Sequence, residues 1–198
     1  MKSKPLIIGL GGTPNPKSST ERALRIALEA AERAGADTRI FGGGQIVSLP
    51  HYSTEPFERL SSARELIELV RAADGLILAS PSYHGAPSGL IKNALDYLQE
   101  TSVDHRPYLD GVPVGLIVTA GGAQAIGSTL AAMRATVHAL RGWPTPLGAA
   151  IIDPASLEPT GLATLSSTRR QVELVGEQVA AFALQQYSNQ NANRILSN

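Results

Sequence analysis

The chain has 198 residues, a length at which we expect a single domain with a sizeable core. Its 17 basic and 17 acidic residues cancel, so the overall charge points neither to nucleic acid nor to an anionic membrane surface as a partner. Cysteine is absent, which excludes disulfides, iron–sulfur clusters and thiolate nucleophiles and favours a reducing, cytoplasmic compartment. No stretch contains the ~18–20 apolar residues of a membrane span.

The first part of the chain alternates apolar runs with helical patterns. Residues 5–10 are apolar throughout, which is typical of a strand buried on both faces, and residues 21–34 place Ala and Leu on one helical face. In chain order, we expect a strand over 5–10, a polar loop over 11–20, a helix over 21–34, a weak strand over 38–41 and an ordered loop over 45–59.

The same alternation continues to the carboxyl end. The clearest run is 112–119, which is apolar on both faces. In chain order, we expect a helix over 60–73, a strand over 75–79, a loop over 80–89, a helix over 90–100, a polar connection over 101–111, a strand over 112–119, a glycine-rich loop over 120–127, a helix ending at Gly142, a strand over 145–152 and a helix over 159–187.

Five apolar strands that alternate with helices predict an α/β domain. In such a domain helices cover both faces of a parallel sheet, and the crossovers are right-handed. We assign residues 1–187 to this single doubly wound domain and residues 188–198 to a polar, frayed tail. The sequence contains no internal repeat and no domain linker.

The loop over 80–89 is the first place to look for function. It follows an expected strand, and in open parallel sheets ligands bind at the carboxyl ends of the strands. Tyr83 and His84 stand at its centre. Prolines fix the backbone and glycines allow it to approach a flat ligand, and this loop has both, at Pro81, Gly85, Pro87 and Gly89.

The loop over 11–20 has the composition of a phosphate site. It offers hydroxyl groups and Lys17 beside the free N–H groups of a helix amino end. It lacks G-x-x-x-x-G-K-[ST], and Pro14 interrupts any G-x-G-x-x-G, so a nucleoside-triphosphate loop is excluded and a dinucleotide loop is disfavoured. The alternative is a helix cap at Ser19 or Thr20 with an ordinary turn before it. The hydroxyl groups belong to Thr13, Ser18, Ser19 and Thr20.

Three motifs follow the first, third and fourth expected strands. They are Gly12-Thr13-Pro14 with Ser18-Ser19-Thr20, then Pro81-x-Tyr83-x-Gly85-x-Pro87-Ser88-Gly89-x-x-Lys92-Asn93-x-x-Asp96, and finally Gly121-Gly122. Together they resemble the NADPH-dependent FMN reductase family, flavodoxin-like proteins that include flavin, quinone, azo-dye and chromate reductases. The middle motif is the most specific. The resemblance implies a flavodoxin-like sheet with strand order 2-1-3-4-5, whose ligand crevice lies between strands 1 and 3.

The resemblance also implies a binding site for FMN. Thr13, Ser18, Ser19 and Thr20 would hold the phosphate. The isoalloxazine ring would be bordered by Pro81, Ser82, Tyr83, His84 and Gly85, and on its other edge by Thr119, Gly121 and Gly122. The family commonly has Arg where this chain has Asn15, and we hypothesise that Lys17 supplies the missing positive charge.

The implied activity is an FMN-dependent NAD(P)H oxidoreductase. Hydride would pass from NADPH or NADH to the flavin and on to a flavin, quinone or azo acceptor, in turn at one pocket, which predicts ping-pong kinetics. The family resemblance further implies a homodimer or homotetramer, and the charged fraction of 17% is compatible with a surface covered by another subunit.

His84 is the candidate proton donor to a reduced acceptor, against the alternative that it is an ordinary loop histidine or a subunit contact. His105 and His138 lack partners at metal-ligand spacing, so we expect no metal.

Two other functions compete with the reductase. An electron-carrier flavodoxin would have the same fold without oxidising NAD(P)H itself, but such carriers are strongly acidic and this chain has a net charge of zero. A domain without flavin would have the same fold with three ordinary turns.

Overall fold

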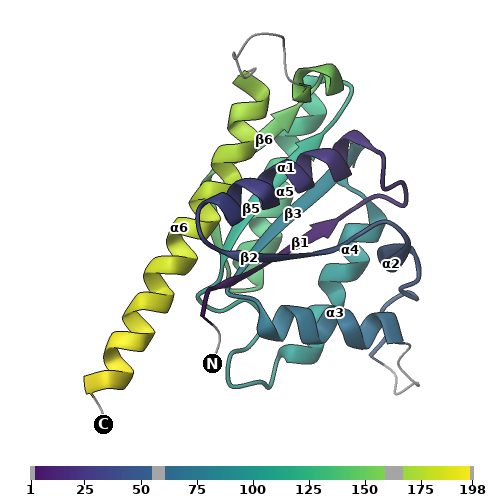
Figure 1. Ribbon diagram of the computed structural model, residues 1–198. Helices are drawn as coiled ribbons and strands as arrows, with labels where there is room; N and C mark the ends of the chain where they lie inside the picture. The colour runs from purple at the N-terminus through teal and green to yellow at the C-terminus, as the bar shows by residue number, and fades with distance from the viewer. Residues whose placement is uncertain (1–2, 55–60, 159–166, 197–198) are drawn as a thin grey trace.

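The computed structural model describes residues 3–54, 61–158 and 167–196, with side chains up to 189. Its centre is a sheet of five parallel strands in the order β2-β1-β3-β5-β6, to which a short sixth strand is added through β3 (Figure 1). Counting only the parallel strands, this is the expected 2-1-3-4-5 order. The parallel strands are β1 (Leu6–Gly11), β2 (Asp37–Phe41), β3 (Gly75–Tyr83), β5 (Pro113–Thr119) and β6 (Trp143–Ile151).

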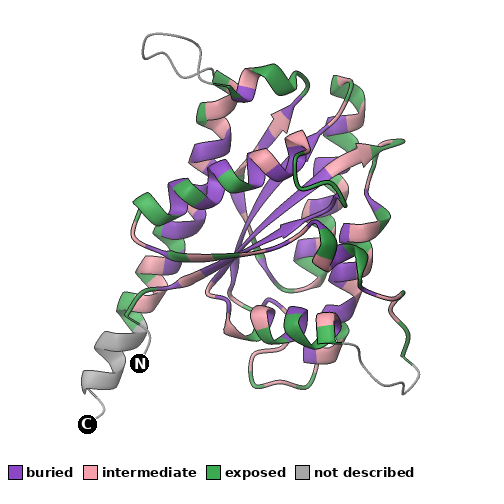
Figure 2. Ribbon diagram, turned by 45° about the vertical axis from the view of Figure 1, so that its right-hand side comes forward, coloured by how far each residue is buried: buried purple, intermediate pink, exposed green. Residues whose placement is uncertain are grey.

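Helices cover both faces of the sheet, as the apolar strands predict. On one face, Ile7, Ile77 and Ile117 belong to the core that α1 and α6 complete. On the other face, Ile8 and Leu76 belong to a second core, completed by α2 to α5. The strands in the middle of Figure 2 are accordingly buried along most of their length. The helices are α1 (Ser19–Arg33), α2 (Gly44–Val47), α3 (Ser61–Ala72), α4 (Gly89–Asp96), α5 (Ala123–Ala139) and α6 (Ser167–Leu196), with 3-10 turns at Tyr97–Thr101 and Pro154–Leu157.

The two helices α1 and α6 pack against each other at the distance of backbone contact. Gly176 of α6 is buried against Ala27 of α1, and a Cβ at Gly176 would lie 2.8 Å from the Ala27 carbonyl carbon. Beside this contact, the buried Glu173 carboxylate lies 3.6 Å from Arg33 of α1. Because Gly176 has no side chain, α1 can pack directly against the backbone of α6.

Strand β6 lies at one edge of the sheet and has an unusual composition for a strand. It contains Pro144 and Pro146, and the side chain of Gln178 from α6 accepts a hydrogen bond from Leu147 N at 3.3 Å. The Trp143 ring is 60% exposed and lies 6.2 Å from the ring of Phe182 on α6. Proline is confined to such edge positions because it cannot donate to a neighbouring strand.

The largest difference from the expected elements lies in residues 80–89. The strand expected over 75–79 continues to Tyr83, and the chain then turns back as β4 (Ala86–Pro87), which pairs antiparallel with β3. The expected loop is therefore mostly a hairpin. Proline at 81 is compatible with a strand here because the pairing of β3 with β1 ends at Ala79, so that Pro81 is paired on one side only, with Thr119 of β5.

Smaller differences concern the ends of elements. The short helix α2 begins at Gly44 and occupies the start of the expected ordered loop over 45–59, of which residues 55–59 fall outside the described part. Strand β6 begins at Trp143 rather than 145, and α5 begins at Ala123 rather than after 127. The last helix runs to Leu196, past residue 187, where the sequence pattern predicts its end. No helix in the described residues is long and apolar enough to cross a membrane.

Candidate cofactor site

The turns after β1 and β3 are held together by buried hydrogen bonds. Gly12 N donates to Ala79 O at 2.8 Å, and the Ser88 hydroxyl, at the amino end of α4, donates to Gly12 O at 2.7 Å. A Cβ at Gly12 would lie 2.9 Å from the Ser88 Oγ and 3.0 Å from Ala79 O, so only glycine fits between them. The two turns that the sequence assigns to one site therefore form one unit at the carboxyl ends of β1 and β3.

Ser88 and Ser80 are buried polar residues of this unit. Ser88 Oγ caps α4 by accepting from Ile91 N at 3.3 Å, and Ser88 N donates to Ser80 Oγ at 2.9 Å. Both serines are buried, at 2% and 0% exposure. Neither was among the predicted site residues, although a serine just before a helical pattern is a known cap signal that could have identified Ser88.

The turn after β1 is organised by Asn15. Its side-chain Oδ1 accepts from Lys17 N at 2.9 Å, and its carbonyl oxygen accepts from Ser18 N at 3.1 Å. Thr13, which is buried, accepts from Asn15 N at 3.3 Å. Asn15 and Lys17 themselves are exposed at the tip of the turn. The asparagine that replaces the expected arginine thus shapes the turn through its amide, as short polar side chains do.

The amino end of α1 offers donors to an anion. Ser18 is the N-cap and accepts from Glu21 N at 3.2 Å, so the expected cap at Ser19 or Thr20 is wrong by one or two residues. The backbone N–H groups of Ser19 and Thr20 have no partner within the part of the chain that the structure describes. Unpaired N–H groups at a helix amino end, together with the helix dipole, favour a phosphate.

Thr20 and Thr119 join this helix end to strand β5. Their hydroxyl oxygens lie 2.6 Å apart, and the two side chains are 2% and 7% exposed. Each hydroxyl satisfies the other inside the protein, so this pair positions the first turn of α1 over the sheet.

The hairpin after β3 has a strained tip. His84 and Gly85 both have positive φ, at 54° and 80°, as a two-residue hairpin loop of type I′ requires. Glycine adopts this conformation freely, whereas histidine does so at a cost. Both Tyr83 and His84 point outward, and Tyr83 is 58% exposed. The two candidate ring-contacting side chains are thus presented at an exposed turn.

Helix α5 anchors this hairpin. The Ser82 hydroxyl donates to Ala125 O at 3.1 Å and lies 2.7 Å from the hydroxyl of Thr129. A Cβ at Gly85 would lie 2.9 Å from Ser128 Oγ. The tip is exposed, but its position is set by three contacts with one helix.

The turn after β5 leaves open space. A Cβ at Gly121 or Gly122 would have no heavy atom within 4 Å among the described residues, and Gly122 is the N-cap of α5. A flat ring can approach the backbone closely where glycines border open space. The expected site residues Gly121 and Gly122 have this property.

Sequence reasoning also missed Glu21, which is 1% exposed in the first turn of α1. Arg25 Nη2 donates to its Oε1 at 2.9 Å, whereas Oε2 has no partner among the described residues. Burial raises the pKa of this carboxyl above its ordinary value, and Arg25 partly offsets the rise. A pattern that puts glutamate at a helix start predicts an exposed residue, so no sequence signal marks it as buried.

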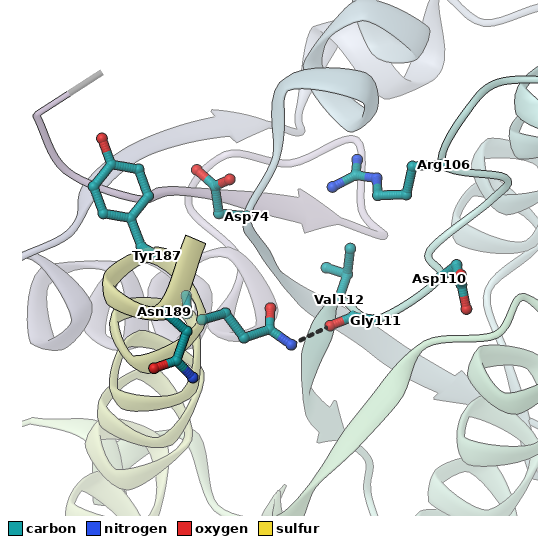
Figure 3. A pocket seen from close by; sticks show the side chains of 9 residues that line it. Asp74, Arg106, Asp110, Gly111, Val112, Tyr187 and Asn189 are labelled. Carbon is teal, nitrogen blue, oxygen red and sulfur yellow. Dashed lines mark hydrogen bonds between the residues drawn. The ribbon is translucent and has the colours of Figure 1, made fainter. Parts of the chain in front are cut away.

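A cavity of about 320 Å³ lies far from these turns, at the amino end of β5 (Figure 3). Two of the polar side chains that line it hold neighbouring elements together. Arg106 donates to Ala73 O at 2.6 Å and to Val70 O at 2.7 Å, which caps the end of α3, and Gln186 donates to Gly111 O at 2.8 Å. Within the described residues, no three His, Asp or Glu side chains gather as they would around a metal ion.

The carboxyl-edge turns fit FMN. The unpaired N–H groups of Ser19 and Thr20 suit a phosphate, and the side-chain-free backbone of Gly121 and Gly122 borders the space that a flat ring would need. These donors are uncharged N–H groups, since the charged side chain of the turn, Lys17, is exposed at its tip.

Comparisons with known proteins identify the family of the chain. The family model of the NADPH-dependent FMN reductases matches residues 5–156. The chain is 40% identical over 132 residues to the NADPH azoreductase of Bacillus sp. strain OY1-2, which covers 66% of this chain and 67% of that protein. It is 41% identical over 83 residues to the FMN-dependent NADPH-azoreductase of Staphylococcus aureus, covering 42% of this chain but only 40% of that relative.

Solved structures share the fold at low sequence identity. An oxidoreductase from Corynebacterium diphtheriae superposes with a TM-score of 0.70 at 16% identity, covering 93% of this chain and 99% of that one. A WrbA-like flavodoxin from Agrobacterium tumefaciens has a TM-score of 0.60 at 16% identity, covering 92% and 99%. The flavodoxin-like fold is thereby confirmed. The chain belongs to the NADPH-dependent FMN reductase family, and it is accordingly an NAD(P)H-dependent oxidoreductase with FMN as its cofactor.

Proposed function

We propose that this enzyme passes reducing equivalents from NADPH or NADH to a planar aromatic acceptor of the azo, quinone or flavin type, and that donor and acceptor use the same pocket in turn. The observation that carries the proposal is the joining of the β1 and β3 turns through Ser88 and Gly12 at 2.7 Å. That bond brings the phosphate-type turn and the ring-type hairpin to one edge of the sheet.

The residues have separate roles in this proposal. The N–H groups of Ser19 and Thr20, with the hydroxyls of Ser18 and Thr13, bind the phosphate, and Lys17 supplies a flexible positive charge at the rim. Thr20 and Thr119 are bonded to each other and keep the helix end in place. Asn15 acts on the phosphate only through the shape of the turn.

The hairpin and the glycine turn hold the ring. Pro81, Ser82 and Gly85 present backbone groups along one edge, and Gly121 and Gly122 approach the other. Bound FMN supplies hydride transfer through its N5 atom, so the protein needs no nucleophile of its own. The chain contributes binding and orientation.

In this proposal Tyr83 and His84 contact the acceptor that binds above the ring. Tyr83 is 58% exposed and offers an aromatic face to a planar acceptor. His84 stands at the strained tip, and it is the side chain we assign to donate a proton to the reduced acceptor. The names of the Bacillus and Staphylococcus relatives, both azoreductases, support an azo compound as one acceptor.

Two measurements test the function. Titration of the purified protein with FMN is expected to quench flavin fluorescence with a micromolar or tighter affinity, of the order that small-ligand sites reach. Anaerobic addition of NADPH is then expected to bleach the flavin absorption, and addition of a quinone or azo dye to restore it. Parallel lines in double-reciprocal plots would support alternation at one pocket, and intersecting lines would contradict it.

The two measurements also separate the competing functions. An electron carrier would bind FMN but leave NADPH unoxidised, whereas a domain without flavin would fail the first titration. Lys17→Ala is expected to weaken FMN affinity at low salt, where exposed charges act most strongly. An unchanged affinity would mean that the exposed lysine does not replace the missing arginine.

We further propose that the chain forms a homodimer or homotetramer. The support is the exposed Trp143 beside Phe182, an apolar surface that is larger than a lone aromatic side chain. Light scattering coupled to size-exclusion chromatography measures the mass directly, and a single peak near the 20.8 kDa of one chain would refute the proposal.

A further inference from the structure

Glu21 occupies a place where a carboxylate is not expected. It lies in the first turn of α1, three residues after the Ser18 cap, yet its side chain is only 2% exposed. The side chain is turned under the helix toward the ends of two strands. A Cβ at Gly11 would lie 2.6 Å from its Oε2, and a Cβ at Gly42 would lie 2.8 Å from the same atom. Gly11 at the end of β1 and Gly42 just after β2 thus make the room that the carboxyl group fills.

This carboxyl group is poorly compensated. Its Oε1 accepts from Arg25, but Arg25 itself is 51% exposed and its charge is partly screened by solvent. Its Oε2 is buried without a hydrogen-bond partner in the described residues. The elements packed against it face it with glycine backbone, and Arg25 is the charged side chain that acts on it. An unpaired buried oxygen of this kind favours the protonated acid over the carboxylate.

The position of Glu21 links it to the cofactor. The N–H groups of Ser19 and Thr20, which would bind the phosphate, belong to the same helical turn as Glu21, and one turn rises only about 5.4 Å. A phosphate and a buried carboxylate within about one helical turn of each other repel each other. A phosphate at this helix end therefore disfavours an ionised Glu21.

We propose that Glu21 takes up a proton when the FMN phosphate binds at the amino end of α1, and that the ionised form of Glu21 weakens this binding. The inference rests on the proposed phosphate site. It makes Glu21 a determinant of cofactor affinity without contact between its side chain and the phosphate. It also predicts that the effect is confined to ligands that carry the phosphate.

The direction of the pH dependence follows from the charge. At low pH Glu21 is neutral with or without FMN, so it has no effect on affinity. As the pH rises through the range in which the free protein loses this proton, FMN must restore it on binding, and the affinity falls. The phosphate loses its own second proton near pH 6, which strengthens binding as the pH rises. The contribution of Glu21 to the pH dependence of FMN affinity is therefore opposite in sign to that of the phosphate. A variant with a neutral residue at position 21 separates the two contributions.

The experiment compares the wild-type protein with Glu21→Gln, which keeps the shape and removes the charge. Dissociation constants for FMN are measured by fluorescence quenching from about pH 5 to about pH 9, and riboflavin, which lacks the phosphate, is the matched ligand. The ratio of wild-type to variant constants for FMN is expected to rise about tenfold with pH, which is the effect of one pKa unit of coupling, and for riboflavin it is expected to stay constant. Calorimetry in buffers of different ionisation enthalpy is expected to show proton uptake on FMN binding by the wild-type protein in excess of that by the variant.

A second variant keeps the proposal testable if Glu21→Gln does not fold. Arg25→Gln removes the positive charge that favours the ionised carboxyl, so the fall in FMN affinity is expected to move to higher pH. A pH-independent ratio, equal proton uptake in both proteins, or the same ratio for riboflavin would each overturn the proposal. If the wild-type protein bound neither flavin, the proposed phosphate site itself would be wrong, which is a distinct result.

Discussion

Replacing Gly176 with alanine tests the close packing of α1 against α6. The added methyl group would overlap the carbonyl oxygen of Ala27 and lie 2.8 Å from its carbonyl carbon and 3.2 Å from its Cα. Carbon atoms pack at about 3.5–4.0 Å, so the two helices must separate by roughly 1 Å. The obstacle is helix backbone, which cannot rotate aside as a side chain does.

The expected cost follows from two opposing effects. Overfilling a packed interior costs about 1–3 kcal/mol, and a clash with backbone belongs at the upper end or beyond it. Alanine returns about 0.8–1 kcal/mol through its better helix propensity. We expect a net loss of about 2 kcal/mol in the free energy of unfolding, which for 198 residues lowers the Tm by about 4–8 °C.

The matched control is Gly127→Ala in α5. A Cβ there has no heavy atom within 4 Å among the described residues, so only the helix propensity changes. We expect this variant to raise the Tm by about 2–4 °C. Urea and thermal unfolding of both variants check the prediction. If Gly176→Ala is stabilised as much as Gly127→Ala, the close contact between α1 and α6 does not exist.

Three further predictions concern the site. Thr20→Val or Thr119→Val leaves one buried hydroxyl without its partner at 2.6 Å, and each is expected to lower the free energy of unfolding by about 1–3 kcal/mol. The double variant is expected to lose less than the sum of the two single losses, and additive losses in urea unfolding would contradict the pairing. Ser88→Ala removes the cap of α4 and the hydrogen bond to Gly12, so we expect a free energy of unfolding lower by about 1–2 kcal/mol and weaker FMN binding in a fluorescence titration. The control is Ser62→Ala, which loses one exposed hydrogen bond to Ser48 O and is expected to leave the FMN affinity unchanged. Burial raises the pKa of Glu21 in the folded protein, so the contribution of Glu21 to stability is full below its unfolded pKa of about 4.5 and is lost as the pH rises through its folded pKa. Glu21→Gln is expected to abolish this loss when the unfolding of the cofactor-free protein is measured against pH. Identical pH profiles of the variant and the wild-type protein would exclude this contribution.

The parallel sheet could be predicted because its strands are apolar on both faces and alternate with helical patterns. The strand over residues 112–119 and the glycine-rich turns after the strands carry this information locally. The position of the candidate site follows from the same pattern, since the carboxyl ends of adjacent parallel strands meet at one edge.

The hairpin at residues 80–89 shows where local reasoning fails. Pro81 and Gly85 are typical of loops, and they outweighed the signals for a continued strand. Two contacts hold this segment: a local one, in which Ser88 N donates to Ser80 Oγ, and a tertiary one, in which the Ser82 hydroxyl donates to Ala125 O of α5. Ala125 is 43 residues from Ser82 in sequence, so no local window contains that contact.

Glu21 shows a second limit. Its helix position and charge predict an exposed residue, and only the two glycines at 11 and 42, brought together by the pairing of β1 and β2, create space for it inside. A space made by missing side chains on two separate strands leaves no periodic signal. The residues of the phosphate and ring turns, among them the buried Thr20 and Thr119, can be predicted from motifs, whereas the buried Ser80 and Glu21 cannot.

The two outer strands of the sheet limit how copies of this chain can associate. On β6, Pro144 and Pro146 have no N–H to donate, and Leu147 N is already bonded to Gln178. On β2, Asp37 and Arg39 are exposed along the border. Neither border is a good template for a further strand from a neighbouring molecule. Any oligomer is therefore expected to form through side-chain contacts, such as those that Trp143 and Phe182 can make, rather than by pairing of strands, and the same features protect the protein against growth into extended β aggregates.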